Sequence, residues 1–124
     1  MPDLDRTVLV LEGDAASREA IRGFFEDAGW RVLAARSSRV AWALVARPGA
    51  RVPDLLIVDP VRGAGLLRLL GSEARPPFVL VSSDRNVAAR AAELGALGVL
   101  AKPVRLSGLL DLYGRIERAG HALV

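Results

Sequence analysis

The sequence predicts an α/β domain in which five short strands alternate with five helices and form one parallel sheet. Apolar runs of four or five residues recur along the chain and are bounded by Gly, Pro, Asp and Ser. Between these runs, apolar residues recur at helical spacing. Strands that alternate with helices favour a parallel sheet covered on both faces. The length of 124 residues suits one domain with one core.

The first half of the chain is expected to contain three strands and two helices. Residues 7–11 are continuously apolar and predict a buried strand. Asp14 is suited to cap a helix that ends at Gly29. The remaining elements of this half are a strand over 30–34, a helix from Ser37 or Ser38 to about Ala46, and a strand over 55–58.

The second half is expected to contain two strands and three helices. A strand over 78–81 is followed by a helix that begins at Asp84 and is closed by Gly95. Because no linker, repeat or low-complexity segment interrupts the pattern, we expect a single domain over 1–124 with a core over about 6–118. The remaining elements are a short leucine-rich helix that ends at about Leu70, a strand over 98–101 and a helix over about 106–118.

Four of the predicted strands run into polar residues that could do chemistry. In a parallel α/β sheet the carboxyl ends of the strands lie along one edge, and ligands bind in the crevice there. We therefore expect carboxylates, a hydroxyl group and a lysine to meet in one pocket, although they are far apart in the sequence. These residues are Glu12, Asp59, Ser82 and Lys102.

Two longer segments, which end at Asp59 and at Lys102-Pro103, carry a pattern found in a known family. Residues 53–59 read Pro-Asp-Leu-Leu-Ile-Val-Asp, and residues 95–103 read Gly-Ala-Leu-Gly-Val-Leu-Ala-Lys-Pro. In this order and at this spacing, the chain resembles the receiver domain of two-component response regulators over about residues 6–118. The resemblance implies a flavodoxin-like three-layer (βα)5 sandwich with strand order 2-1-3-4-5.

The resemblance also implies roles for the strand-end residues. Asp59 matches the phosphoacceptor, and Ser82 and Lys102 match the residues that contact its phosphoryl group. Pro103 matches the structural proline of the family's Lys-Pro pair, and the bond before it is expected to be cis. Such a site uses Mg²⁺, which prefers oxygen ligands from carboxylates and phosphate.

The chain departs from the family pattern at the metal site. Gly13 stands where the family has a carboxylate that contacts the metal, so Glu12 and Asp59 would hold Mg²⁺ only weakly. Pro60 begins a shorter loop than usual, and Val99 replaces the family's aromatic residue on the last strand. Two hypotheses therefore stay open at this point, and neither makes the chain an enzyme.

The first hypothesis is an atypical receiver that acts mainly through protein–protein interaction, with weak or no phosphorylation of Asp59. The alternative is a conventional Mg²⁺-dependent response regulator that a histidine kinase phosphorylates on Asp59. The resemblance implies a kinase or a downstream signalling protein as partner. It also implies a face for partners or homodimers, formed by the helix after Asp84, the strand 98–101 and the helix 106–118. Its charged residues would be Arg85, Arg90, Glu93, Asp111, Arg115 and Arg118.

The composition limits the other function classes. The chain has 17 basic and 14 acidic residues, but its arginines are scattered and no aromatic residues alternate with them, which argues against a nucleic-acid partner. The absence of cysteine excludes disulfides and thiolate metal sites. No apolar run is long enough to span a bilayer, and Met1 is not followed by a signal-peptide pattern. We therefore expect a cytoplasmic protein without a membrane partner.

Overall fold

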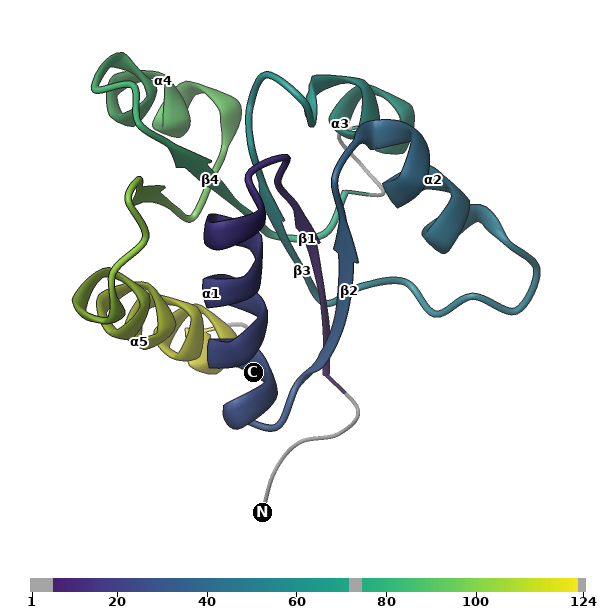
Figure 1. The fold of residues 1–124 in the computed structure, drawn as a ribbon, viewed down its shortest axis with the longest axis horizontal. Coiled ribbons are helices and arrows are strands. Elements are labelled where there is room, and N and C mark those ends of the chain that lie inside the picture. The colour runs from purple at the N-terminus through teal and green to yellow at the C-terminus, as the bar shows by residue number, and fades with distance from the viewer. Residues whose placement is uncertain (1–5, 72–74, 123–124) are drawn as a thin grey trace.

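The computed structural model describes residues 6–71 and 75–122, and a five-stranded parallel sheet forms its centre (Figure 1). The strands lie in the order β2-β1-β3-β4-β5, and every neighbouring pair is parallel. The predicted fold class and strand order are therefore confirmed. The strands are β1 (Thr7–Leu11), β2 (Arg31–Ala35), β3 (Leu55–Val58), β4 (Phe78–Ser82) and β5 (Gly98–Ala101).

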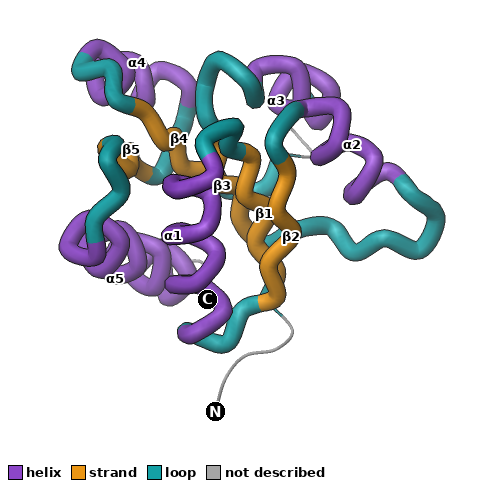
Figure 2. The backbone as a smooth tube through the Cα atoms, in the orientation of Figure 1, coloured by secondary structure: helices purple, strands orange, loops and turns teal. Residues whose placement is uncertain are grey.

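Helices cover both faces of the sheet. Figure 2 shows the strands as one twisted layer, with α1 and α5 on one face and α2, α3 and α4 on the other. Within the described residues, no helix has both the length and the apolar character needed to cross a bilayer. The helices are α1 (Ala15–Asp27), α2 (Ser38–Ala46), α3 (Ala64–Leu70), α4 (Asn86–Leu94) and α5 (Leu106–Ala122).

The predicted helix caps are present, and the element boundaries differ by a few residues. Asp14 Oδ2 accepts hydrogen bonds from the Ser17 backbone N at 2.9 Å and from Ser17 Oγ at 2.7 Å. Ser37, not Ser38, caps α2. The helix expected to begin at Asp84 begins two residues later, because the Asp84 carboxylate accepts from the Asn86 backbone N and forms a turn. The last helix is longer than expected, and residues 1–5 lie outside the described range.

The inner strand β1 shows how both faces of the sheet are covered. All five residues of β1 are buried, and its side chains alternate between two hydrophobic clusters. Val8 and Val10 pack with α1 and α5, whereas Leu9 and Leu11 pack with α2, α3 and α4. A continuous apolar run is therefore required here, since neither face of the strand meets water.

An aromatic cluster joins α1, the start of β2 and α5. Phe25 and Tyr113 lie 5.9 Å apart, and Phe25 and Trp30 lie 5.3 Å apart, both edge to face. The indole Nε1 of Trp30 donates a hydrogen bond to the Tyr113 hydroxyl at 3.1 Å. Trp30 is 5% exposed, so this hydroxyl satisfies a polar group that is otherwise removed from water.

We expect Tyr113→Phe to lower the free energy of unfolding by about 1–2 kcal/mol, because the Trp30 N–H loses its acceptor. Urea denaturation followed by tryptophan fluorescence measures the change. Leu110→Ala on the exposed side of α5 is the control, with an expected change within about 0.5 kcal/mol. Equal stability of Tyr113→Phe and the unchanged chain would contradict this role of the hydroxyl.

Candidate functional site

Three of the four predicted strand-end residues meet at the carboxyl edge of the sheet. The ammonium Nζ of Lys102 lies 2.8 Å from Glu12 Oε2 and 3.3 Å from Asp59 Oδ2. The side chain of Glu12 is 1% exposed, that of Asp59 15% and that of Lys102 21%. A single lysine therefore lies between two largely buried carboxylates.

The register of the sheet produces this arrangement. β1 and β3 are parallel neighbours with Leu11 opposite Val58, so the residues that follow them emerge side by side. The Asp59 backbone N donates to the Leu11 carbonyl at 2.9 Å, which continues the ladder by one residue. Lys102 follows β5, two strands away from β3, and its long side chain spans the gap.

A turn holds the carboxylate of Asp59 in place. Its Oδ1 accepts hydrogen bonds from the backbone N of Val61 at 2.8 Å and of Arg62 at 3.2 Å. Its Oδ2 accepts from Lys102 Nζ. Both oxygens are thus engaged, and the loop that begins at Pro60 supplies the two amides that orient Oδ1.

Glu12 is turned toward the lysine and toward its own loop. Its Oε1 accepts from the Asp14 backbone N at 2.9 Å, while Oε2 faces Lys102. Burial acts to lower the pKa of Lys102, but its hydrogen bonds and charge interactions with Glu12 and Asp59 outweigh burial and raise the pKa above its usual value. Lys102 is therefore a permanent cation at neutral pH.

The space beside Gly13 is occupied by an arginine. A Cβ atom built on Gly13 would overlap the Nε of Arg62 and lie 2.6 Å from its Cζ. The guanidinium of Arg62 therefore lies against the backbone where a side chain would otherwise project. Sequence reasoning missed Arg62, although a glycine at this position and a long cation three residues after Asp59 were the available signal.

A family model provides an independent test of the fold. The model of the response regulator receiver domain matches residues 8–113. This chain is a response regulator receiver domain. The matched range contains Glu12, Asp59 and Lys102, the three residues that meet at the carboxyl edge of the sheet.

Relatives support the same assignment. The DNA-binding transcriptional regulator NtrC of Rhizobium meliloti (strain 1021) is 34% identical over 116 residues, which cover 88% of this chain and 23% of that protein. This chain thus corresponds to about a quarter of the length of that relative. The receiver domain of HemR from Leptospira biflexa has a TM-score of 0.69 and 28% identity, with 91% of this chain and 92% of that chain covered. The chemotaxis response regulator CheY4 of Vibrio cholerae shares the fold, with a TM-score of 0.73, 22% identity and coverage of 90% and 98%.

The donor set of this receiver domain fits a firmly held Mg²⁺ ion poorly. Receiver domains typically bind Mg²⁺, which needs several oxygen ligands with near-octahedral geometry. Within the part of the chain that the structure describes, no three acidic or histidine side chains are grouped to hold a metal. Glu12 and Asp59 already face Lys102, and Asp14 caps α1, where its hydrogen bonds with Ser17 lower its pKa.

The remaining predicted site residues lie at the same edge with different contacts. The Ser82 hydroxyl accepts a hydrogen bond from the Asp84 backbone N at 3.0 Å. Its contact with a phosphoryl group on Asp59 stays a prediction. The bond between Lys102 and Pro103 is cis, as the resemblance implied. Val99 is half-buried and packs against the cluster on the α2–α4 face.

One residue of the expected partner face lies elsewhere. Arg90 was expected on the face formed by α4, β5 and α5, but it lines a pocket between α3 and α4. The reason is helical spacing, because Val87 and Leu94 lie one turn away on either side and line the same pocket. Arg115 agrees with the expectation, because its guanidinium lies over Gly98 of β5.

We expect Lys102→Met to lower the free energy of unfolding by about 3 kcal/mol, because Glu12 keeps a buried carboxylate without its cation. The double variant Glu12→Gln/Lys102→Met removes both charges and should regain much of this loss. Urea denaturation at neutral pH measures both. If the single and double variants were equally stable, Lys102 would not be the counter-charge of Glu12.

The ion pairs of Lys102 with Glu12 and Asp59 should also make the free energy of unfolding depend on pH. Folding raises the pKa of Lys102 above its unfolded value of about 10.4. The stabilising contribution of the charged lysine to the free energy of unfolding is therefore fully present below the unfolded pKa. It is lost as the pH rises through the higher pKa of the folded state. The stability difference between the unchanged chain and Lys102→Met should therefore be constant near neutral pH. It should shrink in strongly alkaline solution.

Proposed function

We propose that this chain is a single receiver domain, with its core over about residues 6–118, that acts mainly through protein–protein interaction. Phosphorylation of Asp59 is weak or absent in this proposal. The observation that carries it is the combination of Gly13 and Arg62 at the cation site. Gly13 supplies no carboxylate there, and the guanidinium of Arg62 occupies the space beside it. Such a domain signals by binding other proteins rather than by catalysing a reaction.

The charges at the site support this proposal. A divalent cation near Asp59 and Glu12 would have to compete with Lys102, which already pairs with both carboxylates. It would also lie close to the positive charge of Arg62. Like charges at a few ångströms repel by several kcal/mol at an effective dielectric of about 20, so Mg²⁺ binding is disfavoured.

The groups that would sense a phosphoryl group also differ from the family pattern. Pro60 and the short loop alter the cradle around Asp59, and Val99 replaces the aromatic residue that the family uses on β5. A ligand shifts a conformational equilibrium only as far as it binds one state better than the other. With these groups changed, a phosphoryl group on Asp59 would discriminate little between two states of the domain.

The exposed surface of α5 and β5 supports a protein partner. A hollow of about 300 Å³ lies along α5 and is lined by Leu110, Asp111, Gly114, Arg115 and Arg118. Leu110 is 57% exposed beside charges of both signs, which is a composition that protein interfaces use. We propose that this face, formed by α4, β5 and α5, contacts a histidine kinase, a downstream signalling protein or a second copy of the chain.

We expect Mg²⁺ to bind the unchanged chain weakly in a calorimetric titration. Gly13→Asp should bind it more tightly, and Gly13→Asp/Arg62→Ala should gain about a further tenfold, or about 1.4 kcal/mol, because the guanidinium no longer fills the space. Asp59→Asn in the double-variant background should weaken binding again. Tight, saturable binding to the unchanged chain would contradict the proposal.

The second experiment separates an interaction module from a conventional phospho-switch. We expect beryllofluoride with Mg²⁺ to leave self-association, measured by sedimentation, unchanged in both the original chain and Asp59→Asn. Arg115→Glu should reduce any self-association or kinase binding, since it reverses a charge on the α5–β5 surface. Intact mass after treatment with acetyl phosphate and Mg²⁺ should show little phosphorylation. A large change that Asp59→Asn abolishes would support the conventional, phosphorylated regulator instead.

A further inference from the structure

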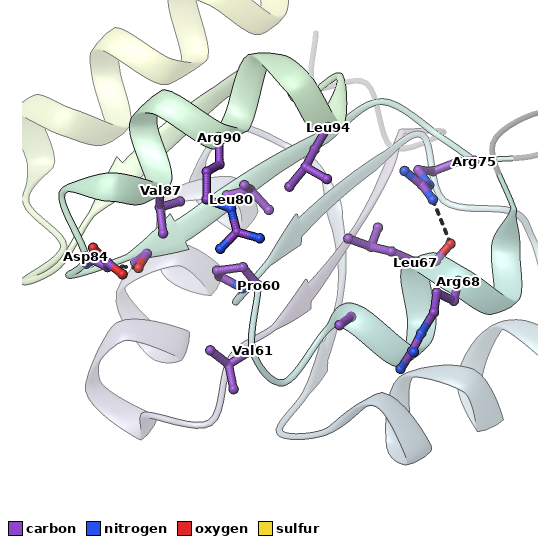
Figure 3. Close-up of a pocket in the computed structure, with 12 residues that line it drawn as sticks. Pro60, Val61, Leu67, Arg68, Arg75, Leu80, Asp84, Val87, Arg90 and Leu94 are labelled. Carbon is purple, nitrogen blue, oxygen red and sulfur yellow. Dashed lines mark hydrogen bonds between the residues drawn. The ribbon is translucent and has the colours of Figure 1, made fainter.

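A pocket of about 440 Å³ opens between α3 and α4, above the carboxyl half of β4 (Figure 3). Its floor is apolar, because Leu67, Leu80 and Val87 line it and are all buried. Leu94 and Pro60 extend this apolar lining at opposite sides. The volume falls in the range of small-molecule sites, which are apolar with a few polar groups that orient the ligand.

The polar group that stands out in this pocket is the guanidinium of Arg90. Figure 3 shows the side chain reaching from α4 into the pocket, with its guanidinium between Leu80 and Pro60. Among the residues that the structure describes, none forms a hydrogen bond or ion pair with it. A guanidinium directed over apolar side chains presents five donors, and a carboxylate, sulfonate or phosphate matches their geometry.

The other charges around the pocket leave it positive. Arg75 lies on the opposite wall, where it donates to the Leu67 carbonyl at 2.9 Å and stacks over Phe78. Arg68 lies at the edge on α3, with its guanidinium directed away from Arg90 in Figure 3. Asp84 is the acidic side chain of the lining, and it lies at the far mouth beside Val87, where it also caps the turn before α4.

From these observations we propose that the α3–α4 pocket binds a small amphipathic anion. The apolar body of the ligand lies on Leu67, Leu80 and Val87, and its acidic group pairs with Arg90. Burial of apolar area supplies much of the affinity, at about 25 cal/mol per Å². The charge-assisted hydrogen bonds with the guanidinium supply the orientation and the selectivity for an anion.

The position of the pocket places such a ligand beside the turn that holds Asp59. Pro60 and Val61 line the pocket, and they directly follow Asp59 in the chain. The Val61 backbone N also donates to Asp59 Oδ1, so a ligand against Val61 contacts the turn that orients this carboxylate. Binding itself does not depend on phosphorylation of Asp59, so it can be tested separately from the function proposed above.

The test uses two fluorescent probes that share an apolar body and differ in charge. 1-Anilinonaphthalene-8-sulfonate carries a sulfonate, whereas N-phenyl-1-naphthylamine lacks it. We expect saturable, single-site binding of the sulfonate and about tenfold weaker binding of the neutral probe, equivalent to about 1.4 kcal/mol. Saturating sulfonate should also raise the melting temperature, because a ligand that binds only the folded state stabilises it.

Three variants locate the site. Arg90→Ala should weaken the sulfonate about tenfold and leave the neutral probe unchanged, whereas Arg22→Ala on α1, at the opposite face of the sheet, is the matched control and should change neither. Ala64→Trp, at the start of α3, should fill the pocket and weaken both probes. Circular dichroism and melting curves confirm that each variant is folded.

The outcomes decide the proposal in either direction. Equal affinity for the two probes, equal effects of Arg90→Ala and Arg22→Ala, or undiminished binding to Ala64→Trp would each overturn it. Displacement of the sulfonate by decanoate, compared with phenyl phosphate, then distinguishes a carboxylate ligand from a phosphate ligand. A negative result here would leave the metal and self-association experiments on the carboxyl edge unaffected.

Discussion

The buried carboxylate of Glu12 is the constraint on which the carboxyl edge of the sheet depends. An ionised group removed from water is stable only when it is paired and hydrogen-bonded. Lys102 provides the charge at 2.8 Å, and the Asp14 backbone N provides a hydrogen bond to the other oxygen. The lysine must therefore reach in from β5, which places it beside Asp59 as well. One electrostatic requirement thus brings together three strand ends.

The same requirement accounts for the pairing of Lys102 with Glu12 and Asp59 under either mode of action. Loss of the lysine would leave Glu12 buried without a counter-charge, whether or not Asp59 accepts a phosphoryl group. Their presence is therefore weak support for phosphorylation. The replacement of a carboxylate by Gly13, and the guanidinium of Arg62 beside it, bears more directly on function because it changes the charge that a metal would meet.

The two surfaces beside α4 differ in shape and composition. The surface of α5 and β5 carries exposed apolar and charged side chains and is suited to a protein. The pocket between α3 and α4 is concave and apolar, and Arg90 gives it a cationic group. The pocket reaches the carboxyl edge through Pro60 and Val61, which follow β3, whereas Arg115 of the α5 surface lies over Gly98 at the amino end of β5.

Much of this molecule could be predicted from local pattern. Buried strands such as Thr7–Leu11 are continuously apolar because both faces of the central sheet are covered, and Asp14 caps α1 through its own neighbours. The parallel alternation of strands and helices then places Glu12, Asp59 and Lys102 at one edge, and the structure brings them within ion-pairing distance. These features could be predicted because they depend on the local spacing of apolar residues and on the geometry of a parallel sheet, which places the carboxyl ends of all strands at one edge.

Other features depend on contacts between residues far apart in the chain, and only the tertiary structure decided them. The guanidinium of Arg62 fills the space left by Gly13 because the loop after β3 folds over the loop after β1. Arg90 belongs to the α3–α4 pocket because the rotation of α4 about its axis, which packing sets, turns Val87 and Leu94 the same way. Sequence periodicity identifies the apolar face of a helix, but the direction of a long charged side chain at its border depends on the space that neighbouring elements leave open.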